Sequence, residues 1–466
     1  MKIKIVLLVM VLIASLVAVN AQQNLTPQEQ EWLTKAYRHD KNGWIYLHIE
    51  GKPFERGFQR GYLTSSEIDK FFKTIALRQK NESGKDIEFF VKAAERLFKN
   101  KVSEEYVLEM KGIAAGIQKA GKEITYSQVL LMNGFIDVLW HWWPQQIEKI
   151  KKMGPGCSAF IATGDATADG KIVMAHNSWD AYITLQFCNI IIEIVPDKGN
   201  KILMQTWGPS LYSTTDFFIT GAGLVGTETT IGDFNGFNAQ GLPIFERARR
   251  AMQYANSIDE WAKILIERNN GAYANSWLLG DINTNEIARL ELGLKHHSFE
   301  KKKNGYFVGS NVADNLEILR DETTAPYDDT RNFAVARRVR WKQLMKKHYG
   351  KIDVELAQQM LADHYDVYLE QDKPSCRTLC GHWELDNGMV PGTISAYFPG
   401  GAIDGKVVDA TMAKSWTLWA KWGHSCDINF NAKEYLEKYP QYDWLEGYLP
   451  NLPPQPWTLF PESNKH

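Results

Sequence analysis

The first third of the chain carries apolar residues at helical spacing. Within residues 86–101, apolar side chains recur every three or four positions, which places them on one face of a helix. Ser103 is a residue type that caps helix starts, and the same periodicity resumes after it. A third helix is predicted over residues 126–143, with Pro144 ending it because proline lacks a backbone donor and clashes with the preceding turn.

From residue 157 onward the pattern changes to short runs rich in β-branched and aromatic residues, which are typical of strands. We predict strands at residues 159–162, 171–176, 189–195, 201–207, 276–281 and 286–292. Ala168-Asp169-Gly170 marks a tight turn, so the first two strands should form a hairpin. Further helices are predicted after Ser257, where Glu260 completes a capping box, and over residues 332–348. Such large blocks favour a layered α+β fold over a doubly wound sheet.

A separate apolar run lies near the N-terminus, from Ile5 to Val19, and two lysines precede it. Val19-Asn20-Ala21 offers small residues at the two positions that a signal peptidase recognises. Residues 1–21 are therefore predicted to be a signal peptide; the alternative, a retained membrane anchor, conflicts with the short length and the flanks of the run. No later stretch is apolar enough to span a bilayer, so we expect a soluble mature protein in the secretory route.

Composition and charge narrow the class of protein only modestly. The 466 residues carry a formal net charge of −2, and loss of residues 1–21 removes two lysines and no acidic residue, giving about −4. Nothing in this balance indicates a nucleic acid or an anionic surface as partner. The absence of a compositional break predicts one large domain or two closely packed parts. Asn24 and Asn81 begin possible glycosylation motifs for a eukaryotic host.

The chain has five cysteines, an odd number for an exported protein. Cys157 is expected to stand outside the disulfides, and two bridges with three possible connectivities remain for Cys188, Cys376, Cys380 and Cys426. The closely spaced pair Cys376 and Cys380 is the expected bridge. A zinc site that adds His382 to this pair would lack a fourth ligand at ordinary spacing, so neither a metal nor another cofactor is expected.

Cys157 directly follows Gly156, and a cut between them would turn the cysteine into a chain terminus. Its α-amine, with a reference pKa of about 7.7 to 8.0, would accept the thiol proton near neutral pH, so one residue would supply both nucleophile and base. Gly156 has no Cβ, which lets the backbone adopt the geometry in which the thiol attacks the preceding carbonyl. The alternative is an inert buried cysteine after a turn, which a Gly-Cys pair alone would favour.

Three residues that follow in the hairpin region are candidate partners of Cys157. His176 ends the second predicted strand and is either a general acid-base or orienting partner of the thiol, or a histidine bonded to backbone. Trp179 is a candidate wall of an acyl pocket, and Asp180 is a candidate partner of the amine or of a substrate dipole. Packing and solvation are the alternative roles for these two residues.

Two further candidates lie later in the chain. Asn275 stands in the polar segment 269–277, which runs into a strand, and an amide held there can donate to the oxyanion that develops during acyl transfer. The alternative is a loop asparagine that bonds to backbone. Arg331 is a candidate partner for carboxylates or for a substrate anion, or else a surface arginine that pairs with neighbouring aspartates.

Five blocks of sequence follow one another after residue 156. They are Cys157-Ser158-Ala159-Phe160-Ile161, His176-Asn177-Ser178-Trp179, Gly223-Leu224-Val225-Gly226-Thr227-Glu228-Thr229-Thr230, Gly271-Ala272-Tyr273-Ala274-Asn275-Ser276-Trp277 and Gly401-Ala402-Ile403-Asp404-Gly405-Lys406-Val407. In this order they resemble the phospholipase B-like family, also called the lamina ancestor family, within the N-terminal nucleophile hydrolases. The chain is shorter than typical animal members, and Ala274 and Ser276 stand where the family usually has more polar residues.

The resemblance implies a four-layer αββα sandwich and self-cleavage before Cys157, after which the pieces stay associated. The mostly helical segment 22–156 would be the N-terminal piece, and residues 157–466 would be the catalytic chain. By residue match, the resemblance implies that Cys157 is the nucleophile and that its new amine is the base. His176 and Trp179 would be site residues beside it, Asn275 would be the oxyanion donor, and Arg331 would be an additional site residue.

The activity that the resemblance implies is removal of acyl groups from lipids or N-acyl amides through a cysteine thioester. The expected location is the lysosome or the cell exterior, or the periplasm if the host is bacterial. Two alternatives stay open: an amidase or acyltransferase of the penicillin acyltransferase type, and a processed protein that binds lipid without turnover. The first would prefer amides over phospholipid esters, and the second would be unaffected by the Cys157→Ala substitution.

Overall fold

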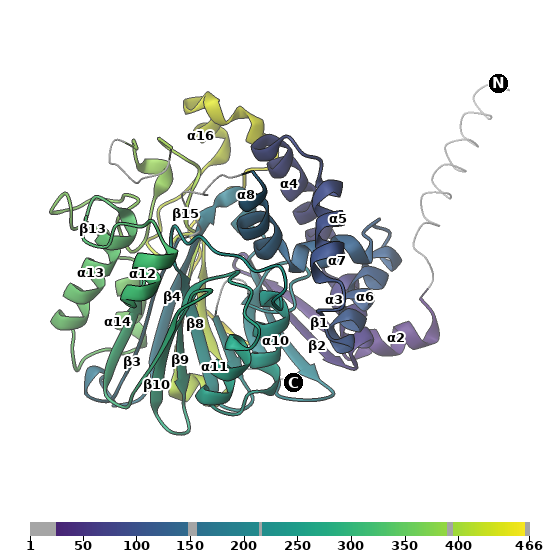
Figure 1. The fold of residues 1–466 in the computed structure, drawn as a ribbon, viewed down its shortest axis with the longest axis horizontal. Coiled ribbons are helices and arrows are strands. Elements are labelled where there is room, and N and C mark those ends of the chain that lie inside the picture. Colours follow the sequence, from purple (N-terminus) through teal and green to yellow (C-terminus); the bar gives the residue numbers. More distant parts are fainter. Residues whose placement is uncertain (1–24, 148–155, 214–216, 389–394, 462–466) are drawn as a thin grey trace, which may run out of the picture.

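Two β-sheets lie face to face at the centre of the molecule, with helices on both outer sides (Figure 1). The computed structural model describes residues 25–147, 156–213, 217–388 and 395–461, so the predicted signal peptide lies outside the described residues. Gly280 belongs to one sheet and Ile161 to the other, and a Cβ added to Gly280 would stand only 3.0 Å from Ile161 Cδ1. The two sheets therefore approach each other closely at this point. Ile161 and Cys157 lie an even number of positions apart on one strand, so both face the opposite sheet.

The described residues form nine strands in the larger sheet and seven in the smaller one. In spatial order the larger sheet contains β1 (Tyr37–Lys41), β2 (Trp44–Gly51), β5 (Ile190–Pro196), β6 (Ile202–Thr206), β7 (Phe217–Thr220), β8 (Leu224–Thr230), β9 (Asn275–Asp281), β10 (Glu286–Leu292) and β11 (His297–Lys302). The smaller sheet contains β12 (Gly305–Gly309), β3 (Gly156–Thr163), β4 (Val173–Ala181), β16 (Asp404–Asp409), β17 (Leu418–Trp422) and β18 (Thr458–Phe460), and β15 (Gly400–Ala402) also pairs with β4. A separate hairpin joins β13 (Tyr365–Asp366) and β14 (Gln371–Asp372).

Helices pack on the outer face of each sheet. The larger sheet is covered by α3 (Pro53–Leu63) and α11 (Ile258–Ile266), and the smaller one by α13 (Phe333–Lys347) and α14 (Val354–Leu361). This arrangement confirms the predicted αββα sandwich. Among the helices of the described residues, none has both the length and the apolar character that a membrane crossing requires.

The other helices of the described residues are mostly short or lie in the N-terminal part. They are α2 (Pro27–Thr34), α4 (Ser65–Ser83), α5 (Ile87–Phe98), α6 (Glu104–Lys119), α7 (Tyr126–Asn133), the π-helix η1 (Ile136–Trp142), α8 (Trp143–Gln146), η2 (Gly164–Ala166), α9 (Tyr182–Leu185), α10 (Ile244–Tyr254), α12 (Leu316–Glu322), η3 (Trp383–Leu385), α15 (Ala410–Lys414), α16 (Ala432–Lys438) and η4 (Pro440–Leu445).

The predicted segment 22–156 is mostly helical where it is described, but it is also part of the larger sheet. Its strand β2 pairs in parallel with β5, from Ile45 opposite Ile190 to Gly51 opposite Pro196. The N-terminal part of the chain therefore completes a sheet whose other strands come after residue 156.

The predicted end of the helix over residues 126–143 is wrong. The chain passes from α7 into η1 and then into α8, which contains Pro144 near its start. A proline in the first turn of a helix is tolerated because its missing N–H would have no partner there. The spacing of apolar residues does not reveal that a new helical segment begins at this point.

Asp137 in η1 predicts a pH-dependent part of the stability. It is fully buried, its Oδ1 accepts a hydrogen bond from Asn270 Nδ2 at 2.6 Å, and burial raises its pKa from 3.8 to about 6. Because the folded protein keeps a proton that the unfolded chain has released, the free energy of unfolding should fall by about 2–3 kcal/mol between about pH 4 and about pH 6. Urea unfolding across this range should show a decline that is smaller by this amount in Asp137→Asn than in the wild-type protein, and equal pH slopes for both proteins would contradict the assignment.

Candidate active site

Cys157 is the second residue of β3 and is almost fully buried, with 4% of its surface exposed. Its backbone N–H donates to Asn311 Oδ1 at 2.9 Å, and its carbonyl accepts a hydrogen bond from Arg337 Nη1. Asn311 is itself held by a hydrogen bond from its Nδ2 to the Thr230 carbonyl of β8 at 2.7 Å. Both backbone groups of the cysteine are therefore fixed. If the bond from Gly156 were cut, the nitrogen that contacts Asn311 would become an amine.

The Arg337 guanidinium joins several groups around Cys157. It comes from α13, is fully buried, and donates from Nη2 to Asn311 Oδ1 at 2.7 Å and from Nη1 to Ser158 Oγ at 3.2 Å. The guanidinium also lies 4.2 Å from the ring centre of Trp179. Burial lowers the pKa of Arg337 to about 9, against the opposing effect of Cys157, so the group stays protonated at neutral pH. A positive charge beside a thiol favours the thiolate.

The predicted β3–β4 hairpin is present, and its register places Ser178 directly opposite Cys157. Ser178 Oγ accepts a hydrogen bond from Lys406 Nζ at 2.6 Å, and the same Nζ lies 2.8 Å from Asp404 Oδ1. Lys406 and Asp404 are both fully buried on β16. A buried ion pair therefore anchors the residue across from the candidate nucleophile, and burial of such charges is tolerated only when both partners are present.

His176 lies opposite Ala159, two positions along β4 from the residue opposite Cys157. It shares the inner face of the sheet with Ser178 because the two are separated by one residue. Burial, and then the charge of Lys406, lower the pKa of His176 well below its usual value despite a contact with the Glu228 backbone. The imidazole is therefore neutral, and a direct role in proton transfer at Cys157 stays a prediction.

Trp179 and Asp180 are both buried at the end of β4. A Cβ added to Gly156 would stand 3.2 Å from Trp179 Cε3, and one added to Gly381 would stand 1.9 Å from Trp179 Cη2. The indole therefore occupies the space in which a side chain at either glycine would lie. Asp180 Oδ2 lies 3.6 Å from Arg78 Nη1 of α4, which ties this strand end to the N-terminal segment. The described contacts of these side chains are thus packing and the Arg337 guanidinium for Trp179, and an ion pair for Asp180.

Asn275 begins β9 and lies opposite Thr230 of β8. The side chain is fully buried, and neither its amide nitrogen nor its amide oxygen has a hydrogen-bond partner among the described residues. The Thr230 carbonyl binds Asn311, which in turn binds Cys157, so two contacts connect this strand pair with the cysteine. Buried polar groups rarely lack partners in folded proteins, and a polar group of a ligand would satisfy this amide.

The family model for phospholipase B matches residues 38–316, which is more than half of the chain. The chain belongs to the phospholipase B family. The matched residues of this phospholipase B family member include Cys157, His176 and Asn275, and they end before α13.

Individual relatives of this phospholipase B family member cover different shares of the chain. A phospholipase B from Crotalus adamanteus is 26% identical over 318 residues, which are 62% of this chain and 54% of that protein. An uncharacterized protein from Archaeoglobus fulgidus is 28% identical over 231 residues, 47% of this chain and 38% of that one. The chain thus spans about half or less of these two relatives. Phospholipase B-like 1 from Bos taurus is 23% identical over 428 residues, 79% of this chain and 75% of that protein.

Among solved structures, a variant of conjugated bile acid hydrolase from Clostridium perfringens matches 58% of this chain and 83% of its own. The TM-score is 0.27 and the sequence identity is 9%. A similarity at this level does not bear on the function of the phospholipase B family member described here.

Two arginines near the start of α13 have different surroundings in this phospholipase B family member. Arg331, which the sequence predicted as a site residue, is 48% exposed in its side chain and pairs with Asp329 at 2.7 Å. This surface pair is the alternative role considered for it. Arg337, six residues later, contacts the Cys157 carbonyl instead. The structure therefore brings Arg337, and not Arg331, to the cysteine.

Four further residues around Cys157 were not predicted from the sequence as site residues. Ser178 and Lys406 belong to two of the five blocks, so a signal for them was present. Asn311 and Arg337 carry no local signal, because an asparagine after a strand and an arginine in a helix are usually solvated. Only the fold brings these two residues together at the backbone of Cys157.

All five cysteines lie in the described residues, and the structure contains no disulfide. The expected bridge between Cys376 and Cys380 is therefore not formed. Arg377 Nη1 donates to Cys376 Sγ at 3.5 Å, whereas Cys380 Sγ lies 3.6 Å from His382 Nε2. The short spacing in sequence suggested a bridge, but the two sulfur atoms have different neighbours in the fold.

Proposed function

We propose that this protein is an acyl hydrolase of the phospholipase B type, which removes acyl groups from lipids or N-acyl amides through Cys157. The observation that carries the proposal is the pair of backbone contacts at this residue, from its N–H to Asn311 and from Arg337 to its carbonyl. These contacts would hold an N-terminal cysteine in one orientation. Membership of the phospholipase B family supports acyl hydrolysis as the reaction.

In the first proposed step, the chain cuts itself between Gly156 and Cys157. The thiol sulfur attacks the Gly156 carbonyl carbon, the carbon–nitrogen bond breaks as the thioester forms, and the thiol proton passes to the departing nitrogen. Water then hydrolyses the thioester, leaving a carboxylate on Gly156 and both a thiol and an amine on Cys157. Asn311 Oδ1 already accepts from this nitrogen at 2.9 Å and would hold the new amine.

Each later turnover repeats this chemistry on an external acyl group. The amine takes the thiol proton, the thiolate attacks the acyl carbonyl carbon, and the departing alcohol or amine takes that proton back. Water then releases the fatty acid and restores the thiol. The positive charge of Arg337 supports the thiolate, and Asn275 is the proposed donor to the oxyanion.

The remaining site residues have proposed supporting roles. His176 would be a neutral orienting group between the sheets, Trp179 would hold Gly156 in place by packing, and Asp180 would bind substrate or fix the strand end through Arg78. The N-terminal fragment 22–156 and the catalytic chain 157–466 would stay associated after cleavage. Entry into the secretory route would follow from the predicted signal peptide, and the family resemblance implies a lysosome or the cell exterior, or the periplasm in a bacterial host.

A kinetic comparison tests this function. Wild-type protein should release fatty acid from phosphatidylcholine or from an N-acyl amide, and Asn275→Ala should lower kcat by about 10²–10³-fold with little change in KM, because the oxyanion exists only in the transition state. The free energy of unfolding should change by less than about 2 kcal/mol, since the deleted amide has no hydrogen-bond partner in the protein. Absence of release from both substrates, or an unchanged kcat in the variant, would refute the assignment.

A further inference from the structure

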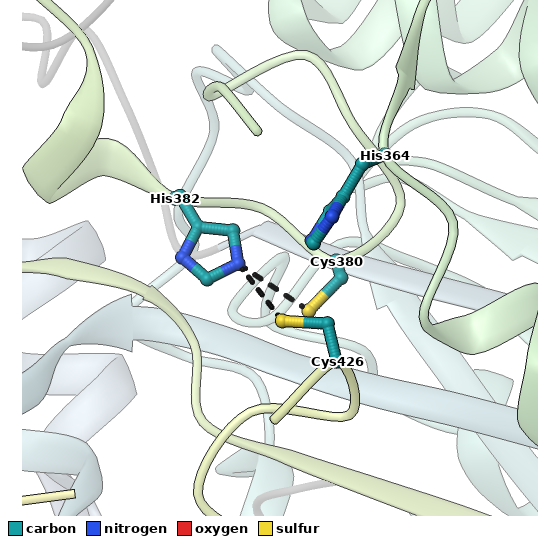
Figure 2. A group of neighbouring side chains, drawn as sticks. All are labelled: His364, Cys380, His382 and Cys426. Atoms are coloured by element: carbon teal, nitrogen blue, oxygen red, sulfur yellow. Dashed lines mark hydrogen bonds between the residues drawn. The ribbon is translucent and has the colours of Figure 1, made fainter. Parts of the chain in front are cut away.

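Two cysteines and two histidines converge at a second place, outside the contacts of Cys157. The residues are His364, Cys380, His382 and Cys426, and their nitrogen and sulfur atoms lie within 4.8 Å of one another. Figure 2 shows the two sulfur atoms next to each other, with the His382 ring facing both and the His364 ring on the other side. They come from three loops: after α14, between β14 and η3, and after β17.

The distances from His382 to the two sulfur atoms are close to those of a tetrahedral zinc site. Zinc bonds of about 2.3 Å to sulfur and about 2.0–2.1 Å to nitrogen separate a neighbouring sulfur and nitrogen by about 3.5 Å. His382 Nε2 lies 3.6 Å from Cys380 Sγ and 3.2 Å from Cys426 Sγ. His364 Nε2 is buried and has no hydrogen-bond partner among the described residues. The two separations from His382 are thus close to those of a zinc site, and the other pairs of ligand atoms lie within 4.8 Å.

The surroundings of His382 match those of a metal-binding histidine. Its Nδ1 lies 2.8 Å from Glu384 Oε1, and a carboxylate at this nitrogen fixes the tautomer in which Nε2 carries the lone pair. Glu384 is also held by the Tyr182 hydroxyl, which donates to Oε2 at 2.9 Å and lies 2.8 Å from His424 Nε2. The imidazole is therefore oriented toward the two sulfur atoms by a buried polar network.

We infer that His364, Cys380, His382 and Cys426 bind one zinc ion in a closed structural site. Two thiolates and two imidazoles form a ligand set that zinc prefers, and four protein ligands leave no open position for substrate. The zinc site considered from the sequence consisted of Cys376, Cys380 and His382 and lacked a fourth ligand. The fold supplies His364 and Cys426 instead, from positions too distant in sequence to be recognised as a motif.

The zinc would hold two loops against β4, the strand that pairs with the strand of Cys157. Asn177 of β4 donates from Nδ2 to the Leu379 carbonyl at 3.1 Å and accepts at Oδ1 from Ser425 Oγ at 2.9 Å. Leu379 precedes Cys380, and Ser425 precedes Cys426. Gly381, between the ligands Cys380 and His382, is so close to the Trp179 ring that an added Cβ would overlap it. A metal here would thus fix the packing of Trp179 without entering the reaction.

Metal analysis of the purified full chain tests the inference. After expression with zinc sulfate and exhaustive dialysis, inductively coupled plasma mass spectrometry should find about one zinc ion per chain. Cys426→Ser and His364→Ala should lower this content at least about fivefold, while Cys376→Ala, a buried cysteine outside the cluster, and Cys157→Ala should retain it. Removal of zinc from the wild-type protein by dipicolinate should lower its melting temperature by at least about 5 °C.

The ligand set can also be read from the wild-type protein alone, in case the variants fail to fold. X-ray absorption at the zinc edge should fit two sulfur and two nitrogen neighbours. A zinc content below about 0.2 per chain in the wild-type protein, a spectrum without sulfur neighbours, or a Cys380–Cys426 disulfide found by peptide mapping would each overturn the inference. None of these measurements depends on turnover, so loss of the proposed hydrolase activity would leave this result unaffected.

Discussion

The Cys157→Ala variant is expected to remain a single uncleaved chain and to lose acyl-hydrolase turnover by at least about 10³-fold. The substitution removes the sulfur that attacks both the Gly156 carbonyl and the external acyl group in the proposed mechanism. Intact-mass analysis under reducing and denaturing conditions should find two fragments for the wild-type protein, the larger beginning with Cys157. Fatty-acid release measured on the same samples gives the loss of turnover.

A buried cysteine elsewhere provides the matched control for this experiment. Cys376 is fully buried and lies outside the backbone contacts of Cys157, so Cys376→Ala should be cleaved like the wild-type protein. Complete cleavage of the Cys157→Ala chain, or a wild-type protein that is fully active as one uncut chain, would exclude self-cleavage by this residue. If the wild-type protein and Cys376→Ala are both cleaved but neither releases fatty acid, the result would point to the lipid-binding alternative.

Replacement of Arg337 by methionine is expected to lower the free energy of unfolding by about 3–5 kcal/mol. The substitution keeps much of the apolar stem but removes the donors to the Cys157 carbonyl, to Asn311 Oδ1 and to the Phe333 carbonyl, which are all buried. Arg337→Lys should recover only part of the loss, because one ammonium cannot reproduce the planar fork of a guanidinium. Urea unfolding followed by tryptophan fluorescence measures both effects.

Arg331→Met is the matched control for Arg337→Met. Its side chain is half-exposed and pairs only with a surface aspartate among its described ion pairs, so the free energy of unfolding should change by less than about 0.5 kcal/mol. Equal losses in the two variants would contradict the distinction that the structure makes between the two arginines.

Periodic segments of the fold could be predicted from the sequence, whereas polar strands could not. The predicted strand at residues 286–292 coincides with β10, and the predicted hairpin is formed by β3 and β4. Strand β8 was not predicted, because Gly226, Thr227 and Glu228 do not form an apolar alternation and are buried by neighbouring strands instead. Pairing with β7 across a short turn and with the more distant β9 makes this strand, rather than an apolar alternation of its own.

The candidate site shows the same division between local and distant information. Cys157 could be proposed as the nucleophile because it is the odd one of five cysteines, lies in a predicted hairpin with His176 and opens the first of the five blocks. Arg337 could not, since a buried guanidinium and a solvated one look alike in a helical pattern. His364 and Cys426 are separated by more than sixty residues, and only the return of the chain to one place makes them neighbours.

The parallel pairing of β2 with β5 has a consequence for the proposed cleavage before Cys157. The two strands would then belong to different polypeptides joined by a continuous ladder of backbone hydrogen bonds, and the mature protein would be an obligate heterodimer. Removal of the smaller subunit would bare the backbone edge of β5, which is a template for aggregation. Unfolding of the cleaved protein should therefore become concentration-dependent, whereas that of the uncut chain should not.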